Sequence, residues 1–400
     1  MGKGADIELK KEKLWNSNYL KVWCANFMIF FSFMLLTPLF PLYLSETFGA
    51  DKQMIGIVLS GYTLTALIIR PFSGYLVDSF PRRVVLLVSY ALFCALFLGY
   101  IAAGSLVLFA IVRTLHGAPF GASTVSNSTV AIDVLHPTRR AEGIGYYGLS
   151  NNIATAIGPT VALMIYGACQ SYDILFWMAF IVSAIGLGIN WTLDLKKRET
   201  VKVSQKISLD RFILLKAWSQ GICMICYAFS YGVLATYIAI YGKNELGITG
   251  GTGMFFMLLS IGLILSRLVG NRTLREGKIV ENASIGVSIA VIGYLVFAAL
   301  HNHWGYYGAA LIIGLGNGHM FPAFQTMFLN LASNEQRGTA NSTLLVSWDI
   351  GVGLGILAGG SVAEHLGYYA AFWTAFAVNL VGVILFLSYS RQHFIRNRVR

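Results

Sequence analysis

Charged side chains are scarce in this sequence: they make up 12% of its 400 residues, whereas 56% are hydrophobic. About a quarter of the residues of a soluble globular domain are charged, so this composition excludes a soluble protein and indicates lipid as the main solvent. Segments that alternate apolar and polar residues, which a membrane β-barrel requires, are also missing. We therefore predict an all-α membrane protein, because the helix is the remaining structure that satisfies its own backbone inside a bilayer.

Cysteine is also rare, and the five cysteines are an odd number in apolar segments, which argues against a disulfide framework. Cys223 and Cys226 form a lone C-x-x-C pair without a nearby histidine, so we interpret them as packing residues and expect no metal site and no cofactor. No ATP-binding motif is present, and acids, histidines and cysteines do not cluster at ligand spacing. The sequence therefore predicts a protein that is not an enzyme.

A cleavable signal sequence is absent too, because residues 1–13 are polar and the apolar segment that follows is longer than a signal core. Apolar stretches of about 20 residues recur along the chain, each long enough to cross about 30 Å of hydrocarbon. Twelve can be counted, among them residues 20–44, 84–103 and 371–389. We predict twelve transmembrane helices.

The net charge of +11 reflects membrane topology rather than nucleic-acid binding. Arg113 is interpreted as the one cation within a span, and most other Lys and Arg residues lie in or beside alternate connections. Such clusters mark the cytoplasmic side. We predict a monomeric integral protein of a bacterial inner membrane, with both termini in the cytoplasm and no nucleic-acid partner.

The two halves of the chain repeat. The least helix-like stretch, residues 195–210, predicts a cytoplasmic linker between one six-helix bundle at 1–194 and another at 211–400. A parallel repeat of this kind relates two bundles by a pseudo-twofold axis along the membrane normal, with the substrate path between them. An offset of 197 residues pairs Gly117 with Gly314, Gly121 with Gly318, Arg140 with Arg337, and Gly158 with Gly355.

The connection after the second predicted span carries a recognisable motif, Gly74-Tyr75-Leu76-Val77-Asp78-Ser79-Phe80-Pro81-Arg82-Arg83. It is similar to the G-x-x-x-D-R-x-G-R-R signature of the major facilitator superfamily, with Ser79 and Pro81 in place of Arg and Gly. The second half keeps Arg275 but has Leu274 in place of the acid. Only Asp78 can therefore act as the carboxylate of this motif.

Three further motifs resemble the twelve-helix drug:proton antiporters of the same superfamily. They are Arg113-x-x-x-Gly117, similar to R-x-x-x-G; Gly145, Ala154, Gly158 and Pro159, similar to G-x8-G-x3-G-P with Ala at the middle glycine; and Pro38-x-x-Pro41, matching P-x-x-P. The resemblance implies the superfamily's fold. The motif from Gly145 to Pro159 is typical of antiporters, so the resemblance also implies export rather than symport.

Asp78 is a candidate conformational switch. An acid at a tight turn can accept hydrogen bonds from the free amides of a neighbouring helix N-terminus, and in the family that helix is the eleventh. The alternative is a loop acid paired with Arg82 or Arg140. The predicted gate consists of Asp78, Arg82, Arg83, Arg139, Arg140, Glu142 and Arg275.

Asp349 is the only acid well inside an apolar span, and burial disfavours the charged form of a carboxyl group. We therefore predict that Asp349 carries the coupled proton, or else makes a structural hydrogen bond. Arg113 is a second candidate for proton coupling, because the resemblance to the family implicates this buried arginine in coupling. The alternative is that its side chain extends to the outer interface between membrane and water. His116 and Asp133 are further candidates, with a structural hydrogen bond and a surface ion pair as their respective alternatives.

Polar and aromatic residues of the central helices are expected to line the substrate cavity, because binding pockets combine apolar walls with a few polar anchors. These are Asn26, Phe30, Asn151, Asn152, Tyr227, Tyr231, Asn317, His319, Gln325 and Trp348. The leading hypothesis is a proton-coupled exporter of small amphipathic molecules, of the multidrug type, that works by alternating access. Alternatives are a dedicated exporter of a metabolite such as a sugar or an opine-type metallophore, and an uptake symporter.

Overall fold

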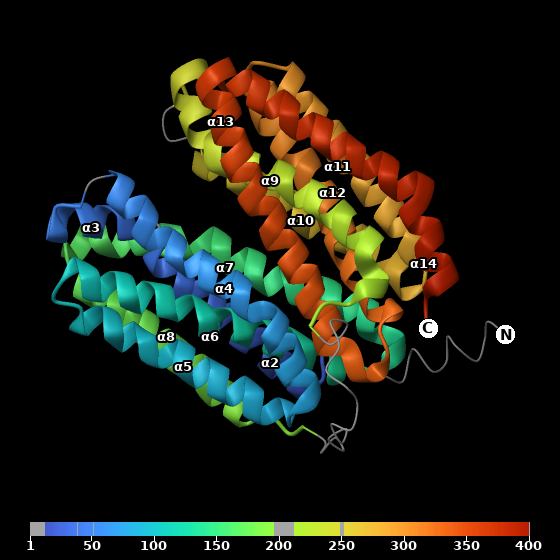
Figure 1. Ribbon diagram of the computed structural model, residues 1–400, viewed down its shortest axis with the longest axis horizontal. Coiled ribbons are helices and arrows are strands. Elements are labelled where there is room, and N and C mark those ends of the chain that lie inside the picture. Colours follow the sequence, from blue (N-terminus) through green and yellow to red (C-terminus); the bar gives the residue numbers. More distant parts are fainter. Residues whose placement is uncertain (1–12, 38, 51, 196–211, 249–251, 400) are drawn as a thin grey trace. The chain divides into compact units, whose positions relative to one another are not determined.

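The computed structural model describes residues 13–37, 39–50, 52–195, 212–248 and 252–399. The described residues form helices and connections, with no strand among them (Figure 1). This agrees with the all-α fold expected for a chain whose backbone must be satisfied within lipid.

The helices of the first half are joined by short connections. Asn16 starts the first of them by accepting a hydrogen bond from the Tyr19 amide, and Ser105 caps α6 through the Leu108 amide. The elements are α2 (Ser17–Leu36), α3 (Phe40–Phe48), α4 (Lys52–Ser79), α5 (Arg82–Ala102), α6 (Leu106–Asp133), η1 (Pro137–Arg139), α7 (Arg140–Cys169) and α8 (Tyr172–Trp191).

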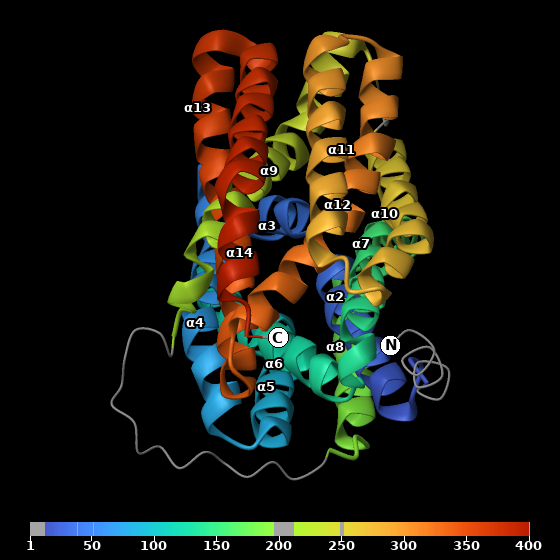
Figure 2. The same ribbon diagram turned by 90° about the vertical axis from the view of Figure 1, so that its right-hand side faces the viewer.

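The second half has the same character. Its longest helix is interrupted at Gly367, which has a φ of +85°. The ribbon of α13 turns back on itself at one end (Figure 2). The elements are η3 (Leu215–Ala217), α9 (Trp218–Leu246), α10 (Thr252–Arg275), α11 (Ile279–Ala299), α12 (His303–Leu331), η4 (Asn334–Gln336), α13 (Arg337–Leu385), the π-helix η5 (Phe386–Ser390) and α14 (Arg391–Asn397).

Membrane spans are evident from length and apolarity. Within the described residues, nine helices are long and apolar enough to cross a bilayer. The protein is therefore an integral membrane protein, as the composition predicted. The count of twelve spans stays a prediction.

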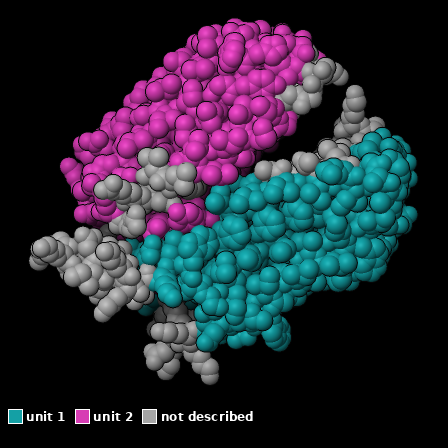
Figure 3. Space-filling view, turned by 180° about the vertical axis from the view of Figure 1, so that it is seen from behind, with its two compact units in different colours: residues 1–139, 147–213, 335–342 teal, residues 140–146, 214–334, 343–400 magenta. Residues whose placement is uncertain are grey.

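Two compact units divide the chain (Figure 3). Unit 1 takes residues 1–139, 147–213 and 335–342, whereas unit 2 takes residues 140–146, 214–334 and 343–400. The first residues of α13 thus belong to unit 1, together with α4 and α6. Of the linker predicted at 195–210, residues 196–210 lie outside the described part of the chain.

Gly117 and Gly314, which the repeat pairs, make equivalent close helix contacts in the two units. A Cβ at Gly117 would collide with the Tyr62 carbonyl, so α6 lies against the backbone of α4. A Cβ at Gly314 would likewise collide with the Leu259 carbonyl, so α12 lies against α10. Helices in lipid gain stability from such close approach, because burial of apolar surface drives their association only weakly. The sequence repeat is therefore a repeat of helix contacts.

Candidate functional site

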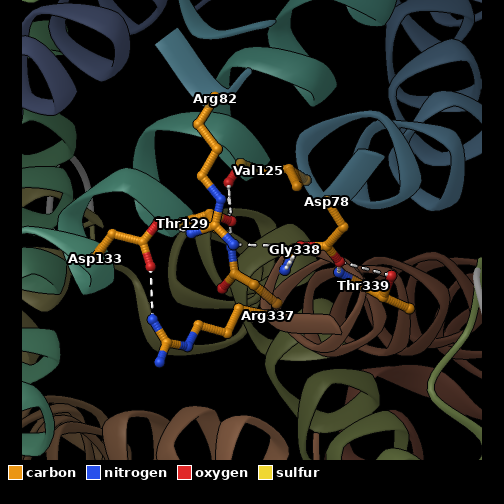
Figure 4. Close-up of polar contacts among 9 residues, drawn as sticks. Asp78, Arg82, Val125, Thr129, Asp133, Arg337, Gly338 and Thr339 are labelled. Atoms are coloured by element: carbon orange, nitrogen blue, oxygen red, sulfur yellow. Dashed lines mark hydrogen bonds and ion pairs between the residues drawn. The ribbon is translucent and has the colours of Figure 1, made fainter. Parts of the chain in front are cut away.

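Asp78 lies one residue before the end of α4 and receives the first amides of α13. Its Oδ1 accepts from the Gly338 N–H at 2.9 Å, and its Oδ2 accepts from the Thr339 N–H at 2.8 Å and the Thr339 hydroxyl at 3.0 Å (Figure 4). These amides have no acceptor within their own helix, and they carry the positive end of its dipole. Asp78 thus caps α13 from another helix, as the motif predicted for the eleventh helix of the family.

Two glycines allow this approach. A Cβ at Gly74 would lie 2.8 Å from the Ser342 Cβ and 3.0 Å from the Gly338 carbonyl oxygen. A Cβ at Gly338 would lie 2.7 Å from the Gly74 carbonyl oxygen. Any larger residue at either position would separate the start of α13 from α4. The motif glycine therefore serves the contact that Asp78 makes.

A set of paired charges surrounds the cap. The Arg82 guanidinium forms ion pairs with Asp78, at 3.4 Å, and with Asp133 at the end of α6. Arg337, the first residue of α13, reaches the other oxygen of Asp133 at 2.8 Å (Figure 4). Two acids and two arginines therefore alternate, and each carboxylate meets a cation. Removing one member of such a buried set costs about 3–5 kcal/mol because it leaves its partner desolvated and unpaired.

The other predicted gate residues lie in different places. Arg83 is exposed and donates to the Trp191 carbonyl at 2.8 Å, at the end of α8. Arg139 ends η1, Arg140 begins α7, and Glu142 is buried in the first turn of α7. The side chain of Arg275 lies outside the described part of the structure.

Arg113 is buried in unit 1 among aromatic rings, with 4% of its surface exposed. Its guanidinium carbon lies 4.0 Å from the centroid of Tyr62, 4.6 Å from that of Phe40 and 5.4 Å from that of Phe33. A desolvated cation–π contact contributes about 2 kcal/mol, whereas burial of an ion costs several kcal/mol. The rings therefore offset only part of the cost.

His116 joins this group through Tyr100. Its Nε2 lies 2.9 Å from the Phe93 carbonyl oxygen and its Nδ1 lies 2.9 Å from the Tyr100 hydroxyl. A carbonyl only accepts, so Nε2 carries the hydrogen and Nδ1 accepts from Tyr100, whose oxygen accepts from Arg113 Nη1 at 3.4 Å. A neutral His116 therefore gives each hydrogen bond of this series one donor and one acceptor. The geometry fits the structural alternative that the sequence left open for His116.

Asn26 and its neighbours form a buried polar network in unit 1. Asn26 donates to the Ser150 hydroxyl at 2.8 Å and accepts from the Tyr147 hydroxyl at 2.7 Å. Only 2% of Asn26 is exposed. The side chain therefore ties α2 to α7.

Three other predicted cavity residues in unit 1 are less buried. Phe30 packs edge-on against Phe120, with centroids 5.7 Å apart. Asn151 accepts from the Thr155 hydroxyl at 3.2 Å, and Asn152 is half-buried beside it on α7.

Trp348 is the centre of an aromatic group in unit 2. Its ring centroid lies 5.4 Å from that of Tyr231 on α9 and 5.5 Å from that of Phe321 on α12. All three side chains are half-buried. Sequence reasoning missed Phe321, which no motif marks. The group offers an apolar, aromatic wall of the kind that binds small amphipathic molecules.

Other predicted cavity residues of unit 2 are held by neighbours. The Tyr227 hydroxyl donates to the Gly382 carbonyl at 2.9 Å. His319 Nδ1 donates to the Asn282 side-chain oxygen at 2.8 Å, and the Asn282 amide returns a bond to the His319 carbonyl at 3.0 Å. Gln325 is buried on α12 and Asn317 is half-buried there.

Asp349 follows Trp348 on α13 and is half-buried. A Cβ at Gly351 or Gly355 would collide with a carbonyl of α9, so these glycines mark the face of α13 that lies on α9. At about 100° per residue, Asp349 lies roughly 140° around the helix from that face. Asp349 therefore starts from a different face of α13 than these two glycines.

The model of the Major Facilitator Superfamily matches residues 22–282 and 283–397 of this chain. The chain belongs to the major facilitator superfamily. This membership confirms the resemblance to the superfamily that the motifs indicated, and it identifies the protein as a membrane transporter.

Relatives and solved structures of the superfamily span nearly the whole transporter. The Staphylopine export protein of Staphylococcus aureus (strain Mu50) is 22% identical over 365 residues, which cover 88% of this chain and 90% of that protein. The Quinolone resistance protein NorA of Staphylococcus aureus (strain COL) is 23% identical over 383 residues, 92% and 95% of the two chains. The human organic anion transporter MFSD10 (TETRAN) has a TM-score of 0.76 at 17% identity, covering 92% of this chain and 99% of its own. FucP in the outward conformation has a TM-score of 0.74 at 16% identity, covering 93% and 99%.

The segment that resembles the antiporter motif lies on α7. A Cβ at Gly158 would lie 2.6 Å from the Met34 Cβ, so α7 packs closely on α2. Gly145 belongs to the segment of α7 that is assigned to unit 2. Pro41 is the second residue of α3, whereas Pro38 and the side chain of Pro159 lie outside the described residues.

A second buried arginine shows that the interpretation of Arg113 as the one cation within a span is wrong. Arg70 lies in α4 and is 7% exposed. The 197-residue offset pairs Arg70 with Arg267, and both interrupt apolar segments. That agreement was the available signal, because cations inside a transporter's spans are rare enough to mark functional positions.

Proposed function

We propose that this transporter is a secondary active exporter of small molecules that works by alternating access and is driven by inward proton flow. The observation that carries the proposal is the Asp78 carboxylate capping the first amides of α13, with Arg82, Asp133 and Arg337 around it. The termini are assigned to the cytoplasm of a bacterial cell and the protein to the inner membrane, where it acts as a monomer.

The cap and its ion pairs form a gate with two states. When the contacts are made, the cytoplasmic end of the substrate path is closed, and breaking them favours the inward-facing state. Undocking of α13 breaks the Arg337–Asp133 pair and frees the Gly338 and Thr339 amides from Asp78, whereas Arg82 keeps both of its carboxylates, which lie on α4 and α6. The equilibrium can therefore be biased by events that change only a few kcal/mol.

Export is the direction that the relatives' names and the α7 motif favour. The Staphylopine export protein and the Quinolone resistance protein NorA each cover most of this chain. Amphipathic solutes suit the aromatic group around Trp348. A dedicated exporter of a charged metabolite is the second candidate, and the buried arginines favour it over a broad exporter of cationic drugs.

Asp349 carries the coupled proton in this proposal. It is half-buried and lies beside the aromatic group, where a proton and an amino group of the solute compete for the same carboxylate. Asp133 is assigned to the gate instead, because both of its oxygens are paired with arginines.

The test is transport into inverted membrane vesicles with an imposed pH gradient, acidic inside, and a panel of quinolones, dyes, sugars and amino-carboxylates. Uptake that needs both the protein and the gradient, and that a protonophore abolishes, supports proton-driven export. Vesicles from cells without the protein are the control. Gradient-driven uptake confined to right-side-out vesicles would instead support a symporter.

A further inference from the structure

Arg113 and Arg82 are both buried cations, but their surroundings differ. Arg82 is paired with two carboxylates, Asp78 and Asp133. Arg113 is as deeply buried, yet within the described part of the chain no carboxylate lies within ion-pair distance of it. Its charge is met there only by aromatic rings and by one hydroxyl group.

The guanidinium carbon lies over the rings, and the N–H groups of a guanidinium point outward in its own plane. A guanidinium has five such donors, and they need acceptors at its edges. Among the described residues, Arg113 makes one hydrogen bond, from Nη1 to Tyr100 at 3.4 Å, and its buried Nε donates to none. The edge formed by Nε and Nη2 is therefore the part of the group that the described side chains leave without an acceptor.

The surrounding contacts keep that edge in a defined orientation. Tyr100 donates its proton to His116, so its oxygen is turned toward Arg113 as an acceptor. His116 is in turn anchored on the Phe93 carbonyl. The rings of Tyr62 and Phe40, whose centroids lie 4.0 Å and 4.6 Å from the guanidinium carbon, restrict its movement. A planar donor edge held this way matches the two oxygens of a carboxylate, which binds arginine in a bidentate fashion.

Charge in unit 1 favours the same ligand. Among the described residues of unit 1, the buried charged side chains are those of Arg70, Arg82 and Arg113, and the acids Asp78 and Asp133 both lie in the gate; the buried acid Glu142 belongs to the segment 140–146 that is assigned to unit 2. A cationic solute near Arg113 would be repelled, whereas an anionic group would be attracted, and strongly so in a medium of low dielectric constant.

We propose that Arg113 binds a carboxylate of the transported solute, so that the protein selects amphipathic acids and zwitterions over purely cationic compounds. The inference rests on the proposed function, because it names the substrate class of that transporter. The Nε edge binds the carboxylate, and Phe33, Phe40 and Tyr62 pack against the apolar body next to it. Solute binding thereby compensates the charge that the resting protein leaves buried.

The experiment compares two probes that differ in one charge: a quinolone with a free carboxylate and the methyl ester of the same quinolone. Equilibrium binding is measured on the purified full-length protein in lipid nanodiscs at pH 7.5, without any gradient. The variants are Arg113→Met, which removes the charge at similar length, and Arg113→Lys, which keeps it. Arg396→Met, at an exposed position of α14, is the matched control for loss of one positive charge.

We expect the wild type and Arg396→Met to bind the acid at least tenfold more tightly than the ester. Arg113→Met is expected to lose that preference while its affinity for the ester changes less than twofold, and Arg113→Lys to keep part of it. The proposal is overturned if the wild type binds the ester as well as the acid, or if Arg113→Met still prefers the acid. The wild-type ratio decides the matter even if Arg113→Met does not fold.

This readout is independent of the vesicle assay. A preference for the acid together with no gradient-driven uptake would remove proton-driven export and leave the carboxylate site. Gradient-driven uptake of the ester at the rate of the acid would support proton-driven export and remove the carboxylate site.

Discussion

Thr339 donates to Asp78 twice, from its backbone N–H at 2.8 Å and from its hydroxyl at 3.0 Å, and both bonds end on the same carboxylate oxygen. The backbone bond exists for any residue at position 339, whereas the hydroxyl bond depends on the side chain. Substitutions at the two positions can therefore separate the charge of the cap from its extra hydrogen bond.

Asp78→Asn is expected to reduce the initial rate of transport at least tenfold while solute affinity stays within about twofold. The amide loses the negative charge that interacts with the helix dipole and with Arg82, and one of its two polar atoms can no longer accept. Thr339→Val is the matched control, because it loses only the hydroxyl bond, worth about 1 kcal/mol. Vesicle uptake and nanodisc binding measure the two quantities. Transport by Asp78→Asn at the wild-type rate would mean that Asp78 is not part of a gate.

Gly74→Ala is expected to reproduce the transport defect of Asp78→Asn with every charge intact. The added methyl group would lie 2.8 Å from the Ser342 Cβ and 3.0 Å from the Gly338 carbonyl oxygen, so α13 must move away from Asp78. Gly188→Ala is the control, because a Cβ there has open space and removes a flexible glycine from α8. Uptake rate and thermal stability are measured for both. Equal activity of the two variants would mean that the close approach is not needed.

Asp349→Asn is expected to abolish gradient-driven transport while slow downhill exchange of solute persists. If protons and solute compete for this carboxylate, the affinity of the wild type rises with pH, and the mutant affinity is flat. The measurement is solute affinity between about pH 5.5 and 8.5, a range on both sides of neutral pH. Identical pH profiles for wild type and mutant would make Asp349 a structural residue.

His116→Gln is expected to leave the pH profile of transport unchanged, even though it lowers stability. Both ring nitrogens are engaged, by Tyr100 and the Phe93 carbonyl, in a chain that a neutral histidine completes. Loss of these bonds in the buried site should cost about 1–3 kcal/mol of unfolding free energy. Transport rates across the pH range test this, with Asp349→Asn run in parallel. A shift of the pH dependence of transport in His116→Gln would instead indicate that His116 carries a proton.

Much of the architecture was readable from the chain. The scarcity of charge predicted a lipid environment, and the paired glycines at 117 and 314 indicated a repeat, whose members the structure shows in equivalent close contacts. The loop motif placed Asp78 at a turn where it could cap the eleventh helix. These inferences succeeded because they depend on local sequence: apolar length, small residues that permit close backbones, and one acid at a helix end.

Tertiary structure alone decided which polar groups meet. Arg337 and Asp133 are 204 residues apart and form an ion pair, and Tyr100 links Arg113 to His116 across two helices. Neither pairing follows from periodicity, because a helix in lipid is apolar on its outer face as well as its packed one, which removes the amphipathic signal that orients helices of soluble proteins. Asn26 and Phe321 illustrate the consequence. The sequence marked Asn26 as a cavity residue and passed over Phe321, whereas packing buries the first between helices and sets the second beside Trp348.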